Sequence, residues 1–205
     1  MESDYLKEIH TILDIAAKNL GERTLDNGTR LVGHIPHVAE EARLHLVFAP
    51  LTSQDIDYIE NQLGLGIPND LRMFYSYHNG LSLFSGSLSI DGLRRNYNRT
   101  GDDVWQPFDI LVANKFESPD DLSNSCFLIG GYRQDGSRLY IDSKTSRVFR
   151  SARATSKPLN EWSSFEEMLL KETRRLDKLF DKDGKRKDSS FPTIPTAFDK
   201  GQFLN

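Results

Sequence analysis

The sequence has little cysteine. It contains one, Cys126, so no disulfide can form within the chain. Cys126 belongs to an apolar run at 126–129, where a free cysteine is more often a small buried hydrophobe than a reactive thiol. A chain of 205 residues is long enough to bury a core without a covalent cross-link. We therefore expect packing alone to hold the fold together.

Long apolar runs are also missing. No stretch approaches the roughly 20 apolar residues that a membrane-spanning helix needs. The first ten residues, MESDYLKEIH, lack the basic region and the apolar region of a secretory signal. We therefore expect a soluble, cytoplasmic protein that has no membrane partner.

Neither sign of charge dominates. The chain has 26 basic and 30 acidic residues, for a formal net charge of −4. A nucleic-acid-binding protein usually carries a basic face, so we expect no direct contact with nucleic acid. With 38% hydrophobic and 27% charged residues, the composition is that of an ordinary globular domain. The oligomeric state does not follow from these numbers.

Motifs of known catalytic sites are missing as well. The chain has no G-x-S-x-G nucleophile elbow. Gly64-Leu65-Gly66 lacks the third glycine of a dinucleotide fingerprint and follows a predicted helix rather than a strand. We therefore expect no enzymatic activity and no cofactor.

One group of residues supports a different class of function. His37, Glu41 and His45 stand four residues apart in a helix that Pro36 is expected to begin, and His34 precedes it. Imidazole and carboxylate groups one helical turn apart can bind zinc, although the H-E-x-x-H pattern is absent. The leading expectation is a solvated helix face with no metal. A metal-dependent enzyme that uses His34, His37, Glu41 and His45 stays as an alternative.

Two short amphipathic helices are predicted within residues 52–80. Thr52 and Asp55 form a capping-box pattern at the start of the first helix, and Gly64 ends it. Pro68 begins the second helix, and an Asn-Gly pair ends it. The apolar faces at helical spacing are Ile56, Ile59 and Leu63, then Leu71, Phe74, Tyr75 and His78.

The remainder of the chain favours strands separated by close turns. Short apolar runs predict a hairpin at 81–90 and an antiparallel meander at 126–149. Between them lie a polar loop and a partly helical stretch at 105–116. A capping box at Ser163 and Glu166 begins a long closing helix. We predict an α+β fold in which a mostly antiparallel sheet of about four to six strands packs against several helices.

We divide the chain into three parts. Residues 1–50 are expected to be a helical attachment packed on the main domain, with helices at 3–20 and 36–46. Residues 51–182 form the α+β domain. Residues 183–205 are a charged tail with proline and glycine, which we expect to be flexible or loosely docked.

Three segments, in this order, resemble the SUKH superfamily, which contains bacterial toxin-immunity proteins and fungal regulators of cell-wall synthesis. The first, 56–80, has an acidic and apolar helix, a Leu-Gly ending, an Ile-Pro-x-Asp corner and an aromatic helix that closes on Asn-Gly. The second joins FLIG at 127–130 to Asp135-Gly136 and LYID at 139–142. The third is WSSFEEML at 162–169. The resemblance covers about residues 51–182, and the loop at 91–103 matches no part of it.

The resemblance implies an α+β domain that binds another protein and has no chemistry of its own. In bacteria, proteins of this superfamily usually neutralise a cognate secreted toxin, often a nuclease, by docking on it. We therefore expect an immunity-type protein whose partner is a cognate protein toxin. The alternative within the family is a regulatory scaffold of cell-wall synthesis or signalling. The residues expected on the partner-binding face are Tyr77, Asn79, Trp105 and Asp142.

Overall fold

The fold is built on one continuous antiparallel sheet. The computed structural model describes residues 3–196. Within them, nine strands lie side by side in sequence order, each antiparallel to the next. The strands are β1 (Glu22–Thr24), β2 (Arg30–His34), β3 (Arg43–Val47), β4 (Leu81–Leu83), β5 (Leu88–Ile90), β6 (Cys126–Gly131), β7 (Arg138–Asp142), β8 (Val148–Ser151) and β9 (Pro158–Trp162).

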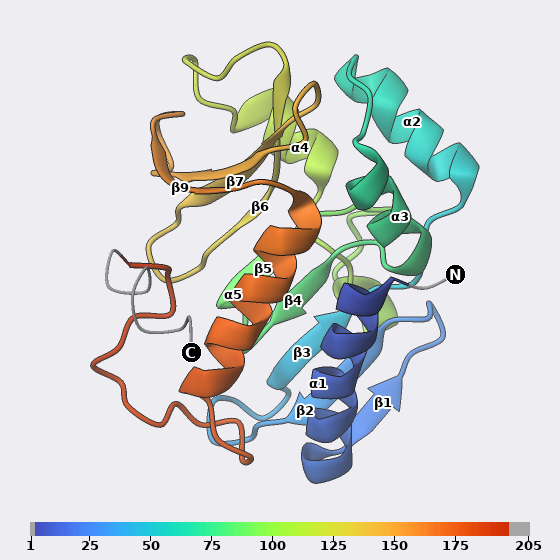
Figure 1. Ribbon diagram of the computed structural model, residues 1–205. Helices are drawn as coiled ribbons and strands as arrows, with labels where there is room; N and C mark the ends of the chain where they lie inside the picture. The colour runs from blue at the N-terminus through green and yellow to red at the C-terminus, as the bar shows by residue number, and fades with distance from the viewer. Residues whose placement is uncertain (1–2, 197–205) are drawn as a thin grey trace.

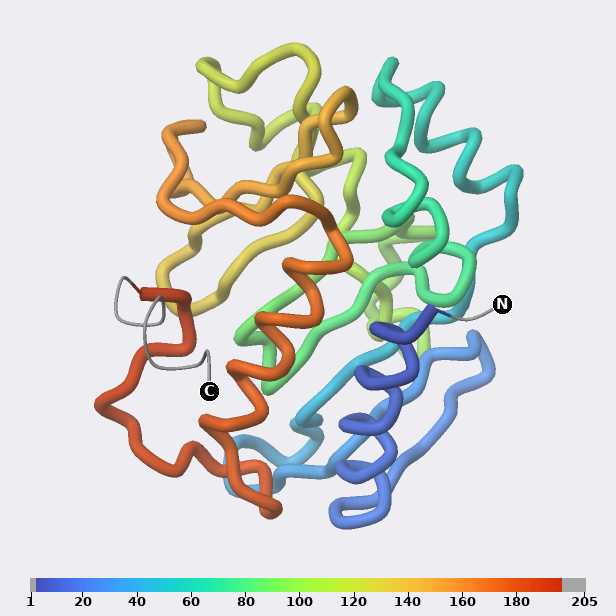
Figure 2. Tube along the Cα trace, viewed as in Figure 1, coloured from blue at the N-terminus to red at the C-terminus, as the bar shows by residue number. Residues whose placement is uncertain are grey.

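The main hydrophobic core lies on one face of this sheet. In Figures 1 and 2, α1 (Asp4–Leu20) and α5 (Phe165–Leu179) lie side by side in front of the strands, with α3 (Asn69–Tyr77) above α1. Both long helices bury an apolar stripe that recurs at helical spacing. The rings of Phe74 in α3 and Phe165 in α5 pack with their centroids 5.0 Å apart. These stripes hold the helices on the sheet.

A smaller apolar cluster lies on the opposite face. Along β6, Phe127 and Ile129 belong to the main core, whereas Leu128 packs with Tyr140 and with Ala113 of α4 (Ile110–Phe116). Successive side chains of a strand point to opposite faces, so this alternation places α4 behind the sheet. The Asn114 side chain fixes α4 there, because it accepts a hydrogen bond from Leu128 N (2.7 Å) and donates one to Leu128 O (2.9 Å).

The predicted helix–corner–helix unit is confirmed. The first helix is α2 (Ser53–Leu63), and its capping box joins Thr52 and Asp55 in both directions. Gly64 ends it at φ 67°, in the left-handed region that favours glycine. The second helix, α3, begins at Asn69, directly after its N-cap Pro68, and ends at Tyr77, with His78 as its C-cap. Local signals were sufficient here because each cap is made by residues close in sequence.

The prediction of a helix at 36–46 is wrong. Residues 36–42 form turns, and Arg43–Val47 is a strand, β3, that pairs with β2 on one side and β4 on the other. A spacing of four residues fits a helix, but pairing with two neighbours satisfies the backbone groups of β3 instead. The N-terminal segment thereby adds three strands. The α+β class is confirmed, and the strand count is nine rather than four to six.

The closing helix begins one residue later than predicted. Ser164 is the N-cap and accepts a hydrogen bond from Glu167 N, and the Glu167 carboxylate accepts one from Ser163 N (2.7 Å). Lys171 and Ser163, which both bind this carboxylate, lower the pKa of Glu167 to about 2. The predicted serine and glutamate types are therefore correct, but the helix is capped by Ser164 and Glu167 instead of Ser163 and Glu166.

The segment after α5 packs on the domain as far as the structure describes it. Arg175 donates to Thr193 O (2.7 Å), and the Thr193 hydroxyl donates to Oε1 of Gln134 (2.8 Å). Arg150 donates to Pro195 O (3.2 Å). Residues 181–196 are thus tied to α5 and to the β6–β7 turn, while the last residues of the predicted tail, 197–205, lie outside the described part. The domain boundaries at 50 and 182 stay a prediction.

Among residues 3–196, we find no helix that combines the length and the apolar character needed to cross a membrane.

Candidate partner-binding groove

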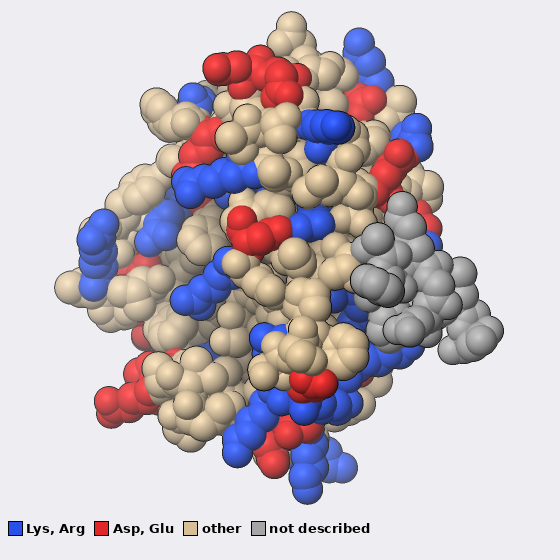
Figure 3. Space-filling model, turned by 90° about the vertical axis from the view of Figure 1, so that its left-hand side faces the viewer, with Lys and Arg blue, Asp and Glu red and all other residues tan. Residues whose placement is uncertain are grey.

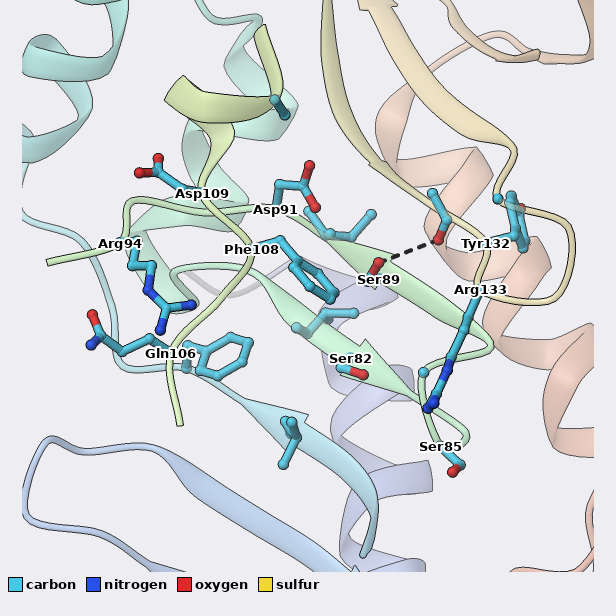
Figure 4. A pocket seen from close by; sticks show the side chains of 18 of the residues that line it. Ser82, Ser85, Ser89, Asp91, Arg94, Gln106, Phe108, Asp109, Tyr132 and Arg133 are labelled. Atoms are coloured by element: carbon cyan, nitrogen blue, oxygen red, sulfur yellow. Dashed lines mark hydrogen bonds between the residues drawn. The ribbon is translucent and has the colours of Figure 1, made fainter. Parts of the chain in front are cut away.

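A groove of about 1060 Å³ lies over β3–β5 and beside α4, on the face of the sheet opposite α1 and α5. We call it the sheet groove. Its floor is formed by β3, β4 and β5, and its walls by the loop at 91–109, α4, the β6–β7 turn and the residues before β3. Figure 4 shows Phe108 pointing over the floor between Asp91 and Ser82.

The floor is polar because of strand alternation. In β4 and β5, Leu81, Leu83, Leu88 and Ile90 face the core, which turns Ser82 and Ser89 into the groove. The Ser89 hydroxyl donates a long hydrogen bond to Gly131 O (3.4 Å). Because both of these side chains are small, they leave room for a partner to approach the backbone of β4 and β5 closely.

The walls expose large apolar side chains. Phe108 is 70% exposed and Tyr97 is 62% exposed, and both line the groove together with Val38. The Tyr97 hydroxyl hydrogen-bonds to Asp109, and the Arg94 guanidinium lies 5.3 Å from the centre of the Tyr97 ring. Aromatic and arginine side chains are the residue types that dominate binding energy at protein interfaces. The composition of the walls therefore suits protein binding.

The loop at 91–109 is held from two sides. From α2, the Asp55 carboxylate accepts two hydrogen bonds from the Arg95 guanidinium (2.6 and 2.8 Å). These bonds hold the pKa of Asp55 far below its ordinary value. From the β1–β2 turn, the Asn27 side chain donates to Asp102 O (3.0 Å), and the Thr29 hydroxyl donates to Trp105 O (3.1 Å). The N-terminal segment and α2 thus both support this wall of the groove.

Replacing Arg95 with alanine tests this support. We expect amide hydrogen exchange in residues 93–106 to accelerate about two- to fivefold, because an exposed bidentate ion pair contributes up to about 1 kcal/mol to local stability. Global stability should change little. Arg99→Ala is the matched control, because Arg99 is an exposed arginine of the same loop that has no interaction in the described structure. Equal exchange in the two variants would show that Asp55 does not hold the loop.

Asn79 fixes the start of the loop at 91–109 through hydrogen bonds to the backbone of Leu93. Its side chain donates to Leu93 O (2.7 Å) and accepts from Leu93 N (2.6 Å). A Cβ atom at position 92 would lie 2.3 Å from Asn79 O, so only glycine fits there. Asn79 is therefore a structural residue that sets where the loop leaves β5.

A buried charge cluster lies at the α4 end of the groove. Asp91 is 2% exposed, and burial raises its pKa to about 7. Its Oδ2 atom lies 3.8 Å from Nη2 of Arg138, which also lies 3.2 Å from the Glu117 carboxylate. Within the described residues, Asp91 Oδ2 has no hydrogen bond. Near neutral pH, this carboxyl group is therefore partly protonated, whereas an ordinary aspartate is ionised.

The structure separates the four residues predicted for the partner-binding face. Trp105 lines the sheet groove. Tyr77 is half-buried against the main core. Asn79 is buried, so the expectation that it is exposed is wrong. Asp142 caps the β7–β8 turn, where it accepts hydrogen bonds from Lys144 N and from the Thr145 hydroxyl.

Sequence reasoning missed the residues that give the groove its character, namely Tyr97, Phe108, Arg133 and Arg153. The available signal was one aromatic residue within the polar loop at 91–103, which the family pattern does not explain, and a second one shortly after it. That signal does not indicate that β3 and the β6–β7 turn lie opposite the loop.

The residues of the alternative metal site do not gather. His34 lies in β2 and hydrogen-bonds to Glu40 O (2.7 Å), whereas His45 is buried in β3 and accepts a hydrogen bond from Phe84 N. His37 and Glu41 lie in the turns between the two strands. No group of three or more potential ligands is close enough to hold a metal ion in the part of the chain that is described.

The chain matches a family model and is similar to a bacterial protein. The family model described as "SMI1 / KNR4 family (SUKH-1)" matches residues 50–171, which is more than half of the chain. A protein of Bacillus subtilis (strain 168) named "Uncharacterized protein YnaB" is 38% identical over 65 residues. These residues are 31% of this chain and 44% of that protein, so the match spans less than half of the relative.

Proposed function

Because the chain belongs to the SMI1/KNR4 (SUKH-1) family, we propose that it is an immunity-type binding protein that neutralises a cognate protein toxin by docking on it. The sheet groove is the proposed docking site. A nuclease is one candidate for the toxin. The protein acts in the cytoplasm in this proposal.

The observation that supports the proposal most strongly is the exposure of Phe108 and Tyr97 inside a groove. Exposed large aromatic side chains cost solvation free energy in the unbound protein, and they anchor many interfaces. A stable complex buries about 1,200–2,000 Å². A groove of this size, together with its rim, can supply one half of such an interface.

The proposed action is stoichiometric and involves no catalysis. Ser89, a potential nucleophile in the groove, donates its hydrogen bond to the Gly131 carbonyl and not to a general base. The metal-dependent alternative has lost its basis, because the helix on which His37, Glu41 and His45 were to share a face does not form.

Co-expression with the products of the adjacent genes tests the function. We expect one neighbour to encode a toxin, to co-purify with this protein in a one-to-one complex, and to lose its toxicity in its presence. Neighbours that include no toxin, or a toxin that does not co-purify, would contradict the proposal. Recovery of several unrelated regulatory partners would support the scaffold of cell-wall synthesis or signalling instead.

A further inference from the structure

The charge of the sheet groove is opposite to that of the whole chain. The chain has a formal net charge of −4. The groove is lined by five arginines and three carboxylates, which are Arg43, Arg94, Arg133, Arg138 and Arg153 with Asp91, Asp109 and Glu117. On the face shown in Figure 3, basic and acidic side chains are intermixed. An excess of arginine inside a groove favours a partner with negative groups.

Two of these arginines are available to a partner. Arg138 contacts Asp91 and Glu117, Arg94 donates to Asn96 O, and Arg43 pairs with Glu41. Within the described residues, Arg133 and Arg153 take part in no hydrogen bond, ion pair or ring contact.

Both arginines lie at the same end of the groove. Ser151 in β8 pairs with Arg138 in β7, which pairs with Gly131 in β6. This register brings the end of β8 beside the β6–β7 turn, and Arg133 and Arg153 follow Gly131 and Ser151 by two residues each. In Figure 4, Arg133 extends over the groove toward Ser85. A guanidinium group binds carboxylates in a bidentate geometry that lysine cannot offer.

The end of the groove opposite Arg133 and Arg153 is apolar and acidic. Phe108 stands over the floor there, Asp109 lies beyond it in Figure 4, and Glu117 follows the last residue of α4. A nucleic acid strand, which repeats a negative charge along its whole length, would bring phosphates against these carboxylates. A peptide can instead place acidic residues at one end and apolar or neutral residues at the other.

We propose that the sheet groove binds an acidic and apolar segment of the partner protein, with partner carboxylates on Arg133 and Arg153 and an apolar side chain on Phe108. This inference rests on the proposed function, because it names the chemistry of the docking segment at the same site.

Fluorescence anisotropy with labelled peptides tests it on the full chain. The probes are a nonapeptide of alternating glutamate and leucine, the same peptide with lysine in place of glutamate, and a 12-nucleotide oligothymidylate. We expect the glutamate peptide to bind at least tenfold more tightly than either other probe at low salt. The double variant Arg133→Glu/Arg153→Glu should weaken binding of the glutamate peptide at least tenfold. Lys144→Glu/Lys182→Glu is the control, because it changes the net charge equally at exposed lysines outside the groove.

Three results would overturn the inference. They are equal or tighter binding of the lysine peptide, tighter binding of the oligonucleotide, and an equal loss of binding in the control variant. A toxin complex that forms normally with Arg133→Glu/Arg153→Glu would also overturn it while leaving the proposed function intact. If no adjacent gene product binds at all, the proposed function fails whatever the peptides do.

Discussion

Replacing Glu172 with leucine should destabilise the fold by about 3–5 kcal/mol. Glu172 and Arg175 are 3% and 6% exposed, and Arg175 donates to Glu172 Oε2 at 2.7 Å. The Tyr132 hydroxyl donates to the same carboxylate (2.8 Å). Burial raises the pKa of Tyr132 well above its ordinary value, so this hydroxyl keeps its proton. The single substitution removes the carboxylate and leaves the buried guanidinium charge.

The double variant Glu172→Leu/Arg175→Met is the matched control. Removing both charges together exchanges a buried ion pair for apolar packing, which is often neutral or stabilising. We therefore expect the double variant to have a clearly larger free energy of unfolding than the single variant. Urea unfolding of the wild type and both variants measures this difference. If the two variants were equally unstable, the loss would come from packing around α5 and not from the unpaired charge.

Stability should depend on pH through three buried groups that act in opposite directions. Burial lowers the pKa of His45 and of His78 from 6.5 to about 3. In the unfolded chain these histidines take up protons below pH 6.5, and in the folded chain they do so only near pH 3. Acidification from pH 6.5 toward pH 3 therefore favours unfolding, by up to about 1.4 kcal/mol per pH unit for each histidine.

Asp91 opposes this effect. Its folded pKa of about 7 lies above the ordinary value of 3.8. Between pH 7 and pH 3.8, the folded state therefore binds a proton that the unfolded state does not, and acidification stabilises the fold by up to about 1.4 kcal/mol per unit. Between pH 6.5 and pH 5, the stabilisation from Asp91 on acidification therefore cancels the destabilisation from one of the two histidines.

Two variants separate these contributions. Asp91→Asn should make the free energy of unfolding fall more steeply between pH 6.5 and 5, because the opposing group is gone. His78→Gln should make it fall less steeply, and glutamine keeps a hydrogen-bonding group for His10, whose Nε2 lies 2.7 Å from His78 Nε2. Urea unfolding at pH 6.5, 5.8 and 5.0 measures both slopes. Parallel slopes in all three proteins would contradict the account.

The sequence was most informative where structure depends on near neighbours. The Thr52–Asp55 capping box, the Gly64 end and the hairpin at 81–90 all depend on contacts between residues a few positions apart. β3 was missed because its strand character comes from pairing with β2 and β4, and β4 lies more than 30 residues away. Its His45 looked like part of a helix face and is instead a buried core residue.

The groove could not be predicted for the same physical reason. Its lining comes from segments around Arg43, Phe108 and Arg153, and the fold alone brings them together. Composition also pointed away from it, since a net negative chain gives no hint of an arginine-lined groove. Trp105 was identified as a candidate, but Tyr97 and Phe108, which also line the groove and are more exposed, were not.

The affinity of a Phe108→Arg variant for the toxin, compared with that of Phe116→Arg, tests the central claim most directly. Phe108 is 70% exposed inside the groove, and Phe116 is 81% exposed at the end of α4 and does not line it. If the groove is the docking site, Phe108→Arg should weaken the complex at least about 30-fold, the equivalent of losing a 2 kcal/mol anchor. Phe116→Arg should leave the affinity within about twofold. Equal affinities of the two variants, or a loss confined to Phe116→Arg, would show that the toxin docks elsewhere.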